Sequence, residues 1–162
     1  MATLHVMVGL PFSGKTTKAK KLEHKYNALL LTSDILHQKL FGNTVNLKQH
    51  NKTDHEKIKN AVELIMQEHA SKILALGVDV ILDFGFCSRA ERDLYRQKAK
   101  EMNADFKIHY MDVPVNELYK RLEKQNKKSP SKVTDGSCPL SREELDRYIS
   151  SFQPPSAEEL KE

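Results

Sequence analysis

A short segment near the N-terminus carries the strongest chemical signal in the sequence. Residues 9–16 read Gly-Leu-Pro-Phe-Ser-Gly-Lys-Thr, so four residues separate two glycines, and a lysine and a threonine follow. Glycines allow backbone angles that side chains would block, and successive amide N–H groups can then face phosphate oxygens. Lys15 can neutralise the β- and γ-phosphates, and the Thr16 hydroxyl can complete the shell of Mg²⁺. The segment predicts binding of a nucleoside triphosphate, with ATP and Mg²⁺ as the expected cofactors.

The surroundings of this loop support the same prediction. The apolar run 4–8 precedes the loop, and apolar residues recur at helical spacing after Lys15, which is the context expected of a phosphate loop. Thr17 adds a second hydroxyl, which we expect near the α-phosphate. The predicted nucleotide contacts within the segment are Gly9, Pro11, Ser13, Gly14, Lys15, Thr16 and Thr17.

Two aspartates come at the ends of later apolar runs. Asp34 follows the run 28–32 and Ser33, and Asp83 closes the run 78–83. We predict that Asp34 accepts or orients the proton of a substrate hydroxyl and forms the catalytic pair with Lys15; the alternative is a capping residue of its helix. Asp83 is predicted to meet Mg²⁺ together with Thr16. Substrate binding, a role as the base, or a turn residue are its alternatives.

Three arginines are candidates for binding negative charge. Arg121 lies on the helix that leads into a polar stretch, and we predict that it contacts the triphosphate or the adenine. Arg89 and Arg92 begin the helix after Asp83 and could reach an acidic or phosphorylated substrate. Each of the three could equally be a surface charge. The polar stretch, residues 126–141, is predicted to be a lid that excludes water, with a solvated loop as the alternative.

Apolar runs and helix-like segments alternate along the chain. The strand-like runs cover residues 4–8, 28–32, 78–82 and 106–111. They predict an α/β fold of three layers, with a parallel sheet of about four to five strands covered on both faces. The carboxyl ends of such strands meet at one edge, where ligands bind. We expect one domain over residues 1–153, followed by an irregular and partly loose tail at 154–162.

One long helix is predicted after a polar loop at residues 42–53. A stripe of apolar residues marks its buried face, and His69 falls on that stripe as a partly buried residue. Gly77 is expected to end the helix because glycine adopts positive φ without strain. The apolar stripe consists of Ile58, Val62, Ile65, Ile73 and Leu76.

Composition narrows the class of protein only modestly. The 162 residues carry 26 basic and 22 acidic side chains, a net charge of +4 that suits ATP, a nucleic-acid end or simply a lysine-rich surface. No apolar run approaches the ~20 residues of a membrane span, and the N-terminus does not resemble a signal peptide. We therefore expect a cytoplasmic protein without a membrane partner. Cys87 and Cys138 fit no metal-ligand spacing.

Taken together, these segments resemble the small P-loop kinases. The resemblance rests on the phosphate loop, on Ser33-Asp34, on Asp-Phe-Gly-Phe-Cys-Ser-Arg-Ala-Glu-Arg at 83–92 and on Arg-Leu-Glu-Lys-Gln-Asn at 121–126. It spans about residues 3–152. The group includes the kinase domain of polynucleotide kinase, chloramphenicol phosphotransferase and the zeta toxins.

The resemblance implies roles for individual residues. Asp34 would act on the acceptor hydroxyl, Asp83 with Arg89 and Arg92 would line the acceptor site, and Arg121 would contact the nucleotide. Two positions depart from the pattern of many relatives, which carry arginine at both. His37 occupies one of them and is expected to line the acceptor site. Gln125 occupies the other, in the lid, where Lys124, Lys127 or Lys128 could compensate.

The sequence thus predicts an ATP-dependent kinase that transfers the γ-phosphoryl group to a hydroxyl of a small molecule or a nucleotide-like acceptor. Two alternatives stay open. One is a polynucleotide 5′-hydroxyl kinase, for which the nucleic-acid end is the partner. The other is an ATP-binding switch protein that is non-catalytic or only hydrolyses ATP.

Overall fold

The computed structural model describes residues 1–41, 52–127 and 140–161. Within these ranges four parallel strands form one sheet in the order β2-β3-β1-β4. The strands are β1 (Thr3–Val8), β2 (Leu29–Thr32), β3 (Val80–Gly85) and β4 (Asp105–Tyr110). This arrangement confirms the predicted α/β fold with a parallel sheet of about four strands.

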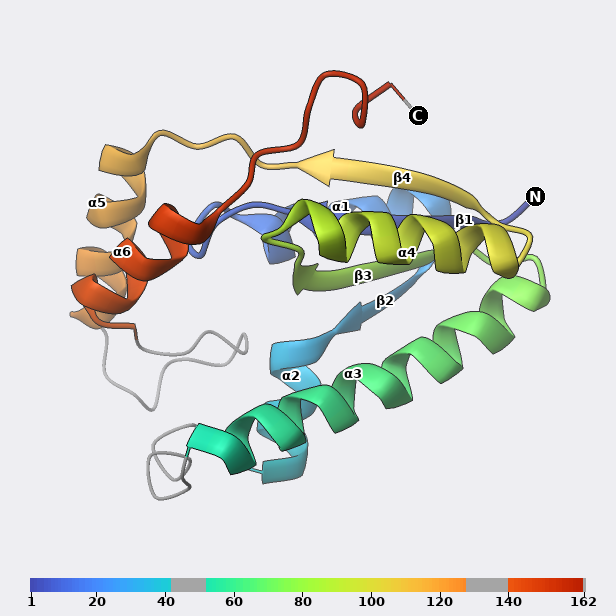
Figure 1. Cartoon of the computed structure of the whole chain (residues 1–162), viewed down its shortest axis with the longest axis horizontal. Helices are drawn as coiled ribbons and strands as arrows, with labels where there is room; N and C mark the ends of the chain where they lie inside the picture. Colours follow the sequence, from blue (N-terminus) through green and yellow to red (C-terminus); the bar gives the residue numbers. More distant parts are fainter. Residues whose placement is uncertain (42–51, 128–139, 162) are drawn as a thin grey trace.

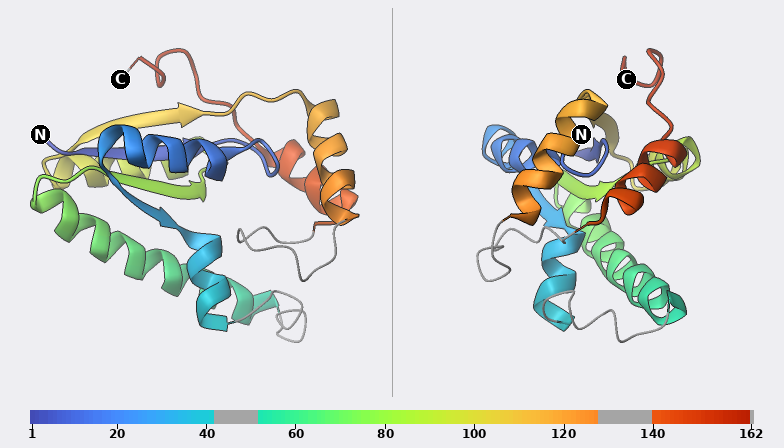
Figure 2. Two further views of the ribbon diagram at one scale, coloured as in Figure 1. Left: turned by 180° about the vertical axis from the view of Figure 1, so that it is seen from behind. Right: turned by 90° about the vertical axis from the view of Figure 1, so that its left-hand side faces the viewer.

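The described ranges contain six helices. They are α1 (Lys15–Tyr26), α2 (Ser33–Phe41), α3 (Lys52–Ala75), α4 (Arg89–Glu101), α5 (Val115–Asn126) and α6 (Arg142–Ser151). Figures 1 and 2 show α1 on one face of the sheet and α4 on the other, with α3 on the α4 side. The helices α5 and α6 lie together beyond the carboxyl ends of the strands. Of the helices in the described ranges, none has the length and apolar character that a membrane crossing requires.

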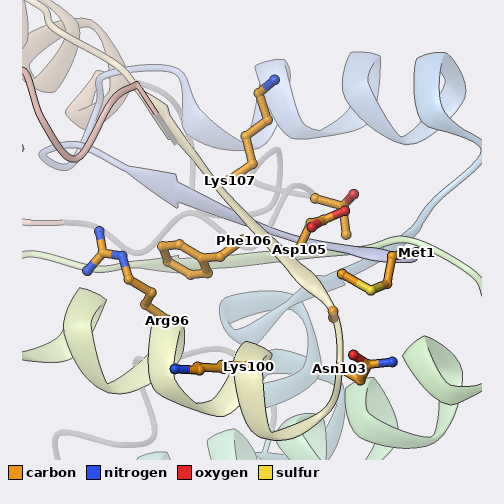
Figure 3. Close-up of a pocket in the computed structure, with 9 residues that line it drawn as sticks. Met1, Arg96, Lys100, Asn103, Asp105, Phe106 and Lys107 are labelled. Carbon is orange, nitrogen blue, oxygen red and sulfur yellow. The ribbon is translucent and has the colours of Figure 1, made fainter.

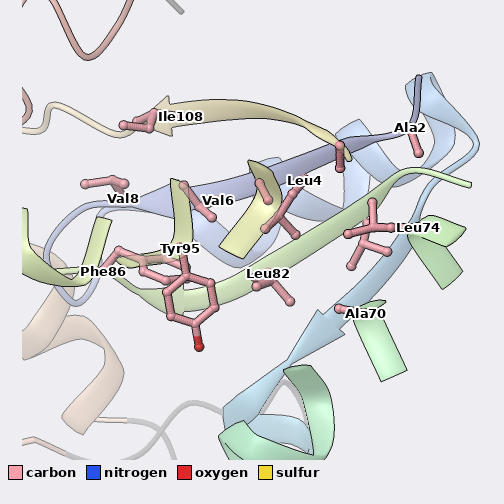
Figure 4. Close-up of a cluster of buried hydrophobic side chains, with 13 residues drawn as sticks. Ala2, Leu4, Val6, Val8, Ala70, Leu74, Leu82, Phe86, Tyr95 and Ile108 are labelled. Carbon is pink, nitrogen blue, oxygen red and sulfur yellow. The ribbon is translucent and has the colours of Figure 1, made fainter. Parts of the chain in front are cut away.

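Strand β1 divides the core into two layers. Its side chains alternate between the faces, as the two-residue repeat of a strand requires. Leu4, Val6 and Val8 pack in one cluster with side chains of α3 and α4, among them Leu74 and Tyr95 (Figure 4). Met7 points to the other face and packs against α1. Burial on both faces explains why the run 4–8 is apolar at every position except His5.

The register of the sheet brings three strand ends to one edge. Val8 of β1 pairs with Gly85 of β3 and with Tyr110 of β4, and Thr32 of β2 pairs with Asp83. The segments that follow β1, β2 and β3 therefore begin side by side. This edge receives the phosphate loop, Asp34 and Asp83.

Helix α3 differs from its prediction. Ile65 and Leu76 are 44% and 80% exposed, and His69 is exposed as well, so their predicted burial is wrong. Residues spaced by four form the buried row instead, because one narrow stripe of a helix meets the sheet. That row is Val62, Met66, Ala70 and Leu74. Gly77, at φ 79°, follows the end of the helix as predicted.

The C-terminal segment after α6 is irregular, with a turn at residues 157–160. It is not loose, however. Pro155 and Glu159 are buried, and Glu159 pairs with Arg92 of α4. The expectation of a partly loose tail is therefore corrected by a buried ion pair.

A histidine pair lies under α1. His5 Nδ1 and His109 Nε2 are 3.0 Å apart, and the His5 ring stacks on Tyr26. Burial, the neighbouring His5 and the charges of Lys107, Lys18 and Lys25 lower the pKa of His109 to about 4. The pKa of His5 is also lowered by burial, although the nearby Asp79 carboxylate opposes that shift. The fold thus holds both rings in the neutral form.

This pair predicts a loss of stability in mild acid. Between pH 6.5 and 4 the unfolded chain binds a proton at residue 109 that the folded chain excludes, so stability falls as the pH falls. For one group the slope is up to about 1.4 kcal/mol per pH unit. In urea unfolding at pH 7 and pH 5, His109→Asn should flatten this slope.

His24→Asn is the matched control, because His24 is exposed on the same face of the molecule, at the end of α1. It should keep the slope of the unsubstituted protein. An unchanged slope in His109→Asn would show that the acid sensitivity arises elsewhere.

Candidate functional site

The phosphate loop connects β1 to α1 and is shaped by its two glycines. Gly9 has φ 152°, and a Cβ atom there would lie 2.8 Å from Ser13 Oγ and 3.1 Å from Met111. Any side chain at Gly9 would therefore clash with the loop. Gly14 has φ 90° and begins α1 as its N-cap residue. Leu10 anchors the loop by packing into the cluster formed by α5 and α6.

The loop presents hydrogen-bond donors that suit an anion. The first N–H groups of α1 have no partner within the helix, and the positive end of the helix dipole lies there. Gly14 offers no side chain to cap them. Ser13 Oγ is buried and has no hydrogen-bond partner among the described residues. Buried polar groups in this state are rare in folded proteins, so the loop fits phosphate oxygens as their missing partners.

Lys15 reaches across the loop that it follows. Its Nζ donates a hydrogen bond to the carbonyl oxygen of Leu10 at 2.8 Å. Burial lowers the pKa of Lys15, while the charges of Asp83, Cys87 and Asp34 act in the opposite direction. A Cβ atom at Gly85 would lie 4.0 Å from Lys15 Cε, which places this side chain beside the end of β3. The cation thus lies among the acidic residues of the site.

Thr16 and Asp83 form a direct link between α1 and β3. Thr16 Oγ1 donates a 2.6 Å hydrogen bond to Asp83 Oδ2. Asp83 is only 5% exposed, and burial raises its pKa, while the Thr16 hydroxyl and Lys15 stabilise its charged form. A hydroxyl and a carboxylate are ligands that suit Mg²⁺, which usually keeps several waters and substrate phosphate oxygens. Within the described ranges no group of three acidic, histidine or cysteine side chains could hold a metal by itself.

Asp34 lies in the first turn of α2, directly after β2. Its pKa is raised by burial and then by the Asp83 carboxylate, while Lys15 and Lys59 lower it. The Asp34 side chain still reaches solvent, which limits the effect of desolvation. The charges of Lys15 and Asp83 therefore both act on the Asp34 carboxylate. His37 follows one turn later on α2 and is half-buried.

Arg121 extends from α5 to the phosphate loop. Its guanidinium donates from one terminal nitrogen to the carbonyl of Phe12 at 3.0 Å and from Nε to Glu117 at 3.0 Å. The same terminal nitrogen would lie 3.9 Å from a Cβ atom at Gly14. The structure thus brings this predicted nucleotide contact next to the loop.

Arg92 does not reach the site. It is fully buried, and its Nε donates to Glu159 Oε1 at 2.8 Å while a terminal nitrogen donates to the Gln153 carbonyl at 2.9 Å. The prediction that Arg92 binds substrate is therefore corrected, because the C-terminal tail encloses its guanidinium. Arg89 is exposed and pairs with Asp93 at 3.4 Å, also on the side of the tail.

The predicted lid at 126–141 lies mostly outside the described residues. Of this segment, Asn126, Lys127, Leu140 and Ser141 are described. Asn126 Nδ2 donates to the Leu140 carbonyl at 3.1 Å and so joins the two ends of the segment. The lid itself remains a prediction, as does compensation by Lys128.

Two residues near the site were not predicted to belong to it, although Cys87 lies within the segment 83–92. Cys87 is half-buried, and burial raises the pKa of its thiol, while the charge of Lys15 opposes the shift. Lys59 of α3 contributes charge at both Asp34 and Cys87. Predicting that Lys59 lies near the site would require the register of α3 against α2. That register depends on packing between the two helices and not on local sequence spacing.

A separate hollow of about 560 Å³ lies at the opposite edge, where the strands begin. Figure 3 shows that its basic side chains do not converge. The Arg96 guanidinium lies near the Phe106 ring, whereas Lys107 points to the other face of β4. This hollow has no convergent set of groups for chemistry, so the candidate site is the edge that carries the phosphate loop.

Comparison with known proteins places the fold in a recognisable group. Residues 4–155 match the AAA domain family (AAA_33). A shikimate kinase of Corynebacterium jeikeium strain K411 is 27% identical over 135 residues, which is 83% of this chain and 66% of that protein. The chain therefore spans slightly less than two thirds of the length of this curated relative.

Several solved structures share the architecture. Chaetomium thermophilum Kti12 in complex with ADP-AlF3 has a TM-score of 0.69 at 18% identity and covers 94% of this chain and 81% of its own. A sugar kinase of Janibacter sp. HTCC2649 has a TM-score of 0.63 at 17% identity, covering 99% and 82%. A chain of the Pnkp1/Rnl/Hen1 RNA repair complex scores 0.68 at 21% identity, covering 93% and 43%. At these identities the likeness establishes the P-loop kinase fold.

The position of Arg121 yields a prediction about nucleotide affinity. Arg121→Ala removes a guanidinium that lies beside the phosphate loop, and hydrogen bonds to charged groups contribute about 1.5–3 kcal/mol. We expect the Kd for ATP with Mg²⁺ to rise about tenfold or more. Isothermal titration calorimetry measures this directly.

Lys120→Ala serves as the control, since Lys120 is exposed on the same helix. Its affinity for ATP should match that of the unsubstituted protein. Equal affinities in the two variants would remove Arg121 from the nucleotide site.

Proposed function

The chain belongs to the AAA domain family and has the fold of the small P-loop kinases, and from this premise we propose that it is an ATP-dependent kinase. It transfers the γ-phosphoryl group to a hydroxyl of a small-molecule or nucleotide-like acceptor. One observation carries the proposal. The Thr16–Asp83 hydrogen bond, Lys15 and Asp34 share one edge of the sheet, with a cation between two carboxylates. We treat residues 1–153 as one kinase domain.

The donor half is built on the phosphate loop. Loop amides and Lys15 hold the phosphates, and Lys15 exchanges its bond to the Leu10 carbonyl for bonds to the β- and γ-phosphates. Thr16 and Asp83 are the residues that would hold Mg²⁺, which neutralises charge on the phosphates when it is bound. Arg121 adds a second protein cation from α5.

The transfer step needs a group that handles the acceptor proton. The acceptor oxygen forms a bond to the γ-phosphorus while the bond from that phosphorus to the β–γ bridging oxygen breaks, which leaves ADP. Asp34 orients the hydroxyl and takes its proton. The Asp83 carboxylate favours this role because like charge raises the proton affinity of Asp34. Positioning and charge contribute more than the base itself, since the transition state is loose.

The choice of acceptor class rests on two observations. The curated relative is a kinase named for the small molecule shikimate, which supports a small-molecule acceptor. Arg92 is enclosed by Glu159 and is not available to hold an acceptor phosphate, and the exposed Arg89 pairs with Asp93 of its own helix on the side of the tail. His37, Lys59 and Asp34 remain as the described polar groups on the acceptor side.

Lys15→Ala tests the donor half. Removing a cation aimed at developing charge costs about 10²–10³-fold in rate, so ATP turnover should fall by at least that factor. Lys18→Ala, one helical position beyond the site and exposed, is the control and should keep its turnover. Turnover would be measured as ATP-dependent mass shift across a panel of hydroxyl compounds that includes sugars, amino alcohols and nucleosides.

Asp34→Asn tests the acceptor half. Loss of a general base lowers the transfer rate by about 10²-fold, while the Kd for ATP should stay unchanged because the phosphate loop is intact. In the unsubstituted enzyme the acid limb of the rate should lie above the usual range of an aspartate, since the pKa of Asp34 is raised. Asp112→Asn is the control at an exposed position after β4. Unchanged transfer in Asp34→Asn would remove Asp34 from catalysis.

The nucleobase of the phosphate donor, adenine or guanine, requires its own test. Residues 51–54 read Asn-Lys-Thr-Asp, an order that specifies guanine in many GTP-binding proteins, and Lys52 is the first residue of α3. ATP and GTP should therefore be compared as donors in the same assay. The proposal expects the larger kcat/KM with ATP.

A polynucleotide 5′-hydroxyl kinase is the second candidate, favoured by the fold likeness to a chain of an RNA repair complex. Phosphate contacts release counterions, so binding of an oligonucleotide would weaken steeply with salt. For the small-molecule proposal we expect oligonucleotide binding at about 150 mM salt to be no tighter than the Kd of about 10⁻⁴–10⁻⁶ M that is typical of non-specific binding. Tight, salt-dependent binding with 5′ phosphorylation would favour the alternative; nucleotide binding without any product would favour a switch protein.

A further inference from the structure

A buried ion pair ties the C-terminal tail to α4. Arg92 and Glu159 are 0% and 4% exposed, and Arg92 donates to both carboxylate oxygens, at 2.8 and 3.3 Å. Hydrogen bonds from Arg92 lower the pKa of Glu159 to about 2, so the carboxylate is ionised at neutral pH. The Ser156 amide also donates to Glu159 at 2.9 Å. Loss of one partner would leave a buried charge without its counterion.

The same guanidinium holds the loop between β3 and α4. Arg92 donates to the Phe86 carbonyl at 3.5 Å and to the Gln153 carbonyl at 2.9 Å, and the Gln153 amide donates to the Cys87 carbonyl at 2.9 Å. Gly85, the last residue of β3, and Phe86, the first residue of the loop, have positive φ, at 101° and 33°. A phenylalanine in this region is strained and persists only where its surroundings fix it.

This loop borders the site on the acceptor side. It begins at Phe86, directly after β3, and a Cβ atom at Gly85, the last residue of that strand, would lie 4.0 Å from Lys15 Cε. The Cys87 thiol lies within the field of Lys15 and Lys59. A shift of this loop would therefore change the surroundings of Lys15 and of the Cys87 thiol, while the phosphate loop keeps its own anchor at Leu10.

We propose that Glu159 is a positioning residue, which fixes the acceptor-side loop 86–88 through Arg92 and Gln153. The term acceptor side rests on the proposed function. Glu159 lies beyond residues 4–155, the part that matches the family, so this contact belongs to the chain's own tail. Figure 1 shows the tail running from α6 back past α4, which lets a segment distant in sequence hold the loop.

The reactivity of Cys87 tests the proposal without knowledge of the acceptor. In a Cys138→Ser background Cys87 is the remaining thiol of the two in the chain. Glu159→Gln keeps the shape of the side chain and removes its charge. We expect modification by a maleimide to become about tenfold faster, because local opening of the loop exposes the thiol. The Kd for ATP with Mg²⁺ should stay within about twofold, since the phosphate loop is a separate site.

Glu158→Gln is the matched control, an exposed glutamate on the same turn, and should change neither quantity. Arg92→Lys is the second variant. Lysine retains a buried cation opposite Glu159 but cannot bridge two carboxylate oxygens and two carbonyls, so it should also speed the modification of Cys87. Equal thiol rates in Glu159→Gln and Glu158→Gln would overturn the proposal. Faster modification with a parallel loss of ATP affinity, or global unfolding of both Glu159→Gln and Arg92→Lys, would assign the pair a general structural role and overturn it too.

Transfer kinetics then connect the loop with function. With any acceptor found in the panel, Glu159→Gln should raise the acceptor KM several-fold and leave the KM for ATP unchanged, a split that a general loss of stability would not produce. If the unsubstituted protein phosphorylates no acceptor, the proposed function fails. The positioning role is still decided by the thiol rates.

Discussion

The hydrogen bond from Thr16 to Asp83 is the contact on which the geometry of the site depends. It joins the first turn of α1 to the end of β3 and thus fixes the phosphate loop against the sheet. Asp83 is buried there at a cost in desolvation, which Thr16 and Lys15 offset only in part. The like charge of Asp83 in turn acts on Asp34 of the neighbouring strand segment. One donor–acceptor pair therefore sets both the position of the loop and the electrostatics of its neighbour.

Local chemistry made much of this arrangement predictable. The phosphate loop is identified by residue types whose conformational demands are strict, and Gly9 leaves no room for a side chain. Strands β1 to β3 are mostly apolar, in keeping with a covered sheet, whereas β4 alternates apolar and polar residues, and the order of the strands along the chain predicts a shared edge. The roles of Asp34, Asp83 and Arg121 stay predictions, now supported by their proximity to the loop.

Long-range packing accounts for the rest. Arg92 and Glu159 are 67 residues apart, so no local sequence pattern predicts their ion pair. An arginine that follows an aspartate in the sequence is equally consistent with a substrate contact and with a structural ion pair. On α3 the apolar residues exceed what one narrow contact stripe can bury, so Ile65 remains exposed, as does Leu76 just past the end of the helix. The charge of Lys59 in α3 acts on Asp34 in α2, and the placement of these two helices depends on contacts between elements.

In the strand order β2-β3-β1-β4, the residues proposed to bind the phosphates lie at the central strands, and the residue proposed to act on the acceptor lies after an edge strand. The phosphate loop and Asp83 extend from the central strands β1 and β3, which are buried from both sides. Asp34 extends from β2, which has a neighbour on one side within the described sheet. Sequence change around a marginal strand disturbs few other contacts. Under the proposed function, this topology allows acceptor specificity to change during evolution while the residues that bind the triphosphate stay the same.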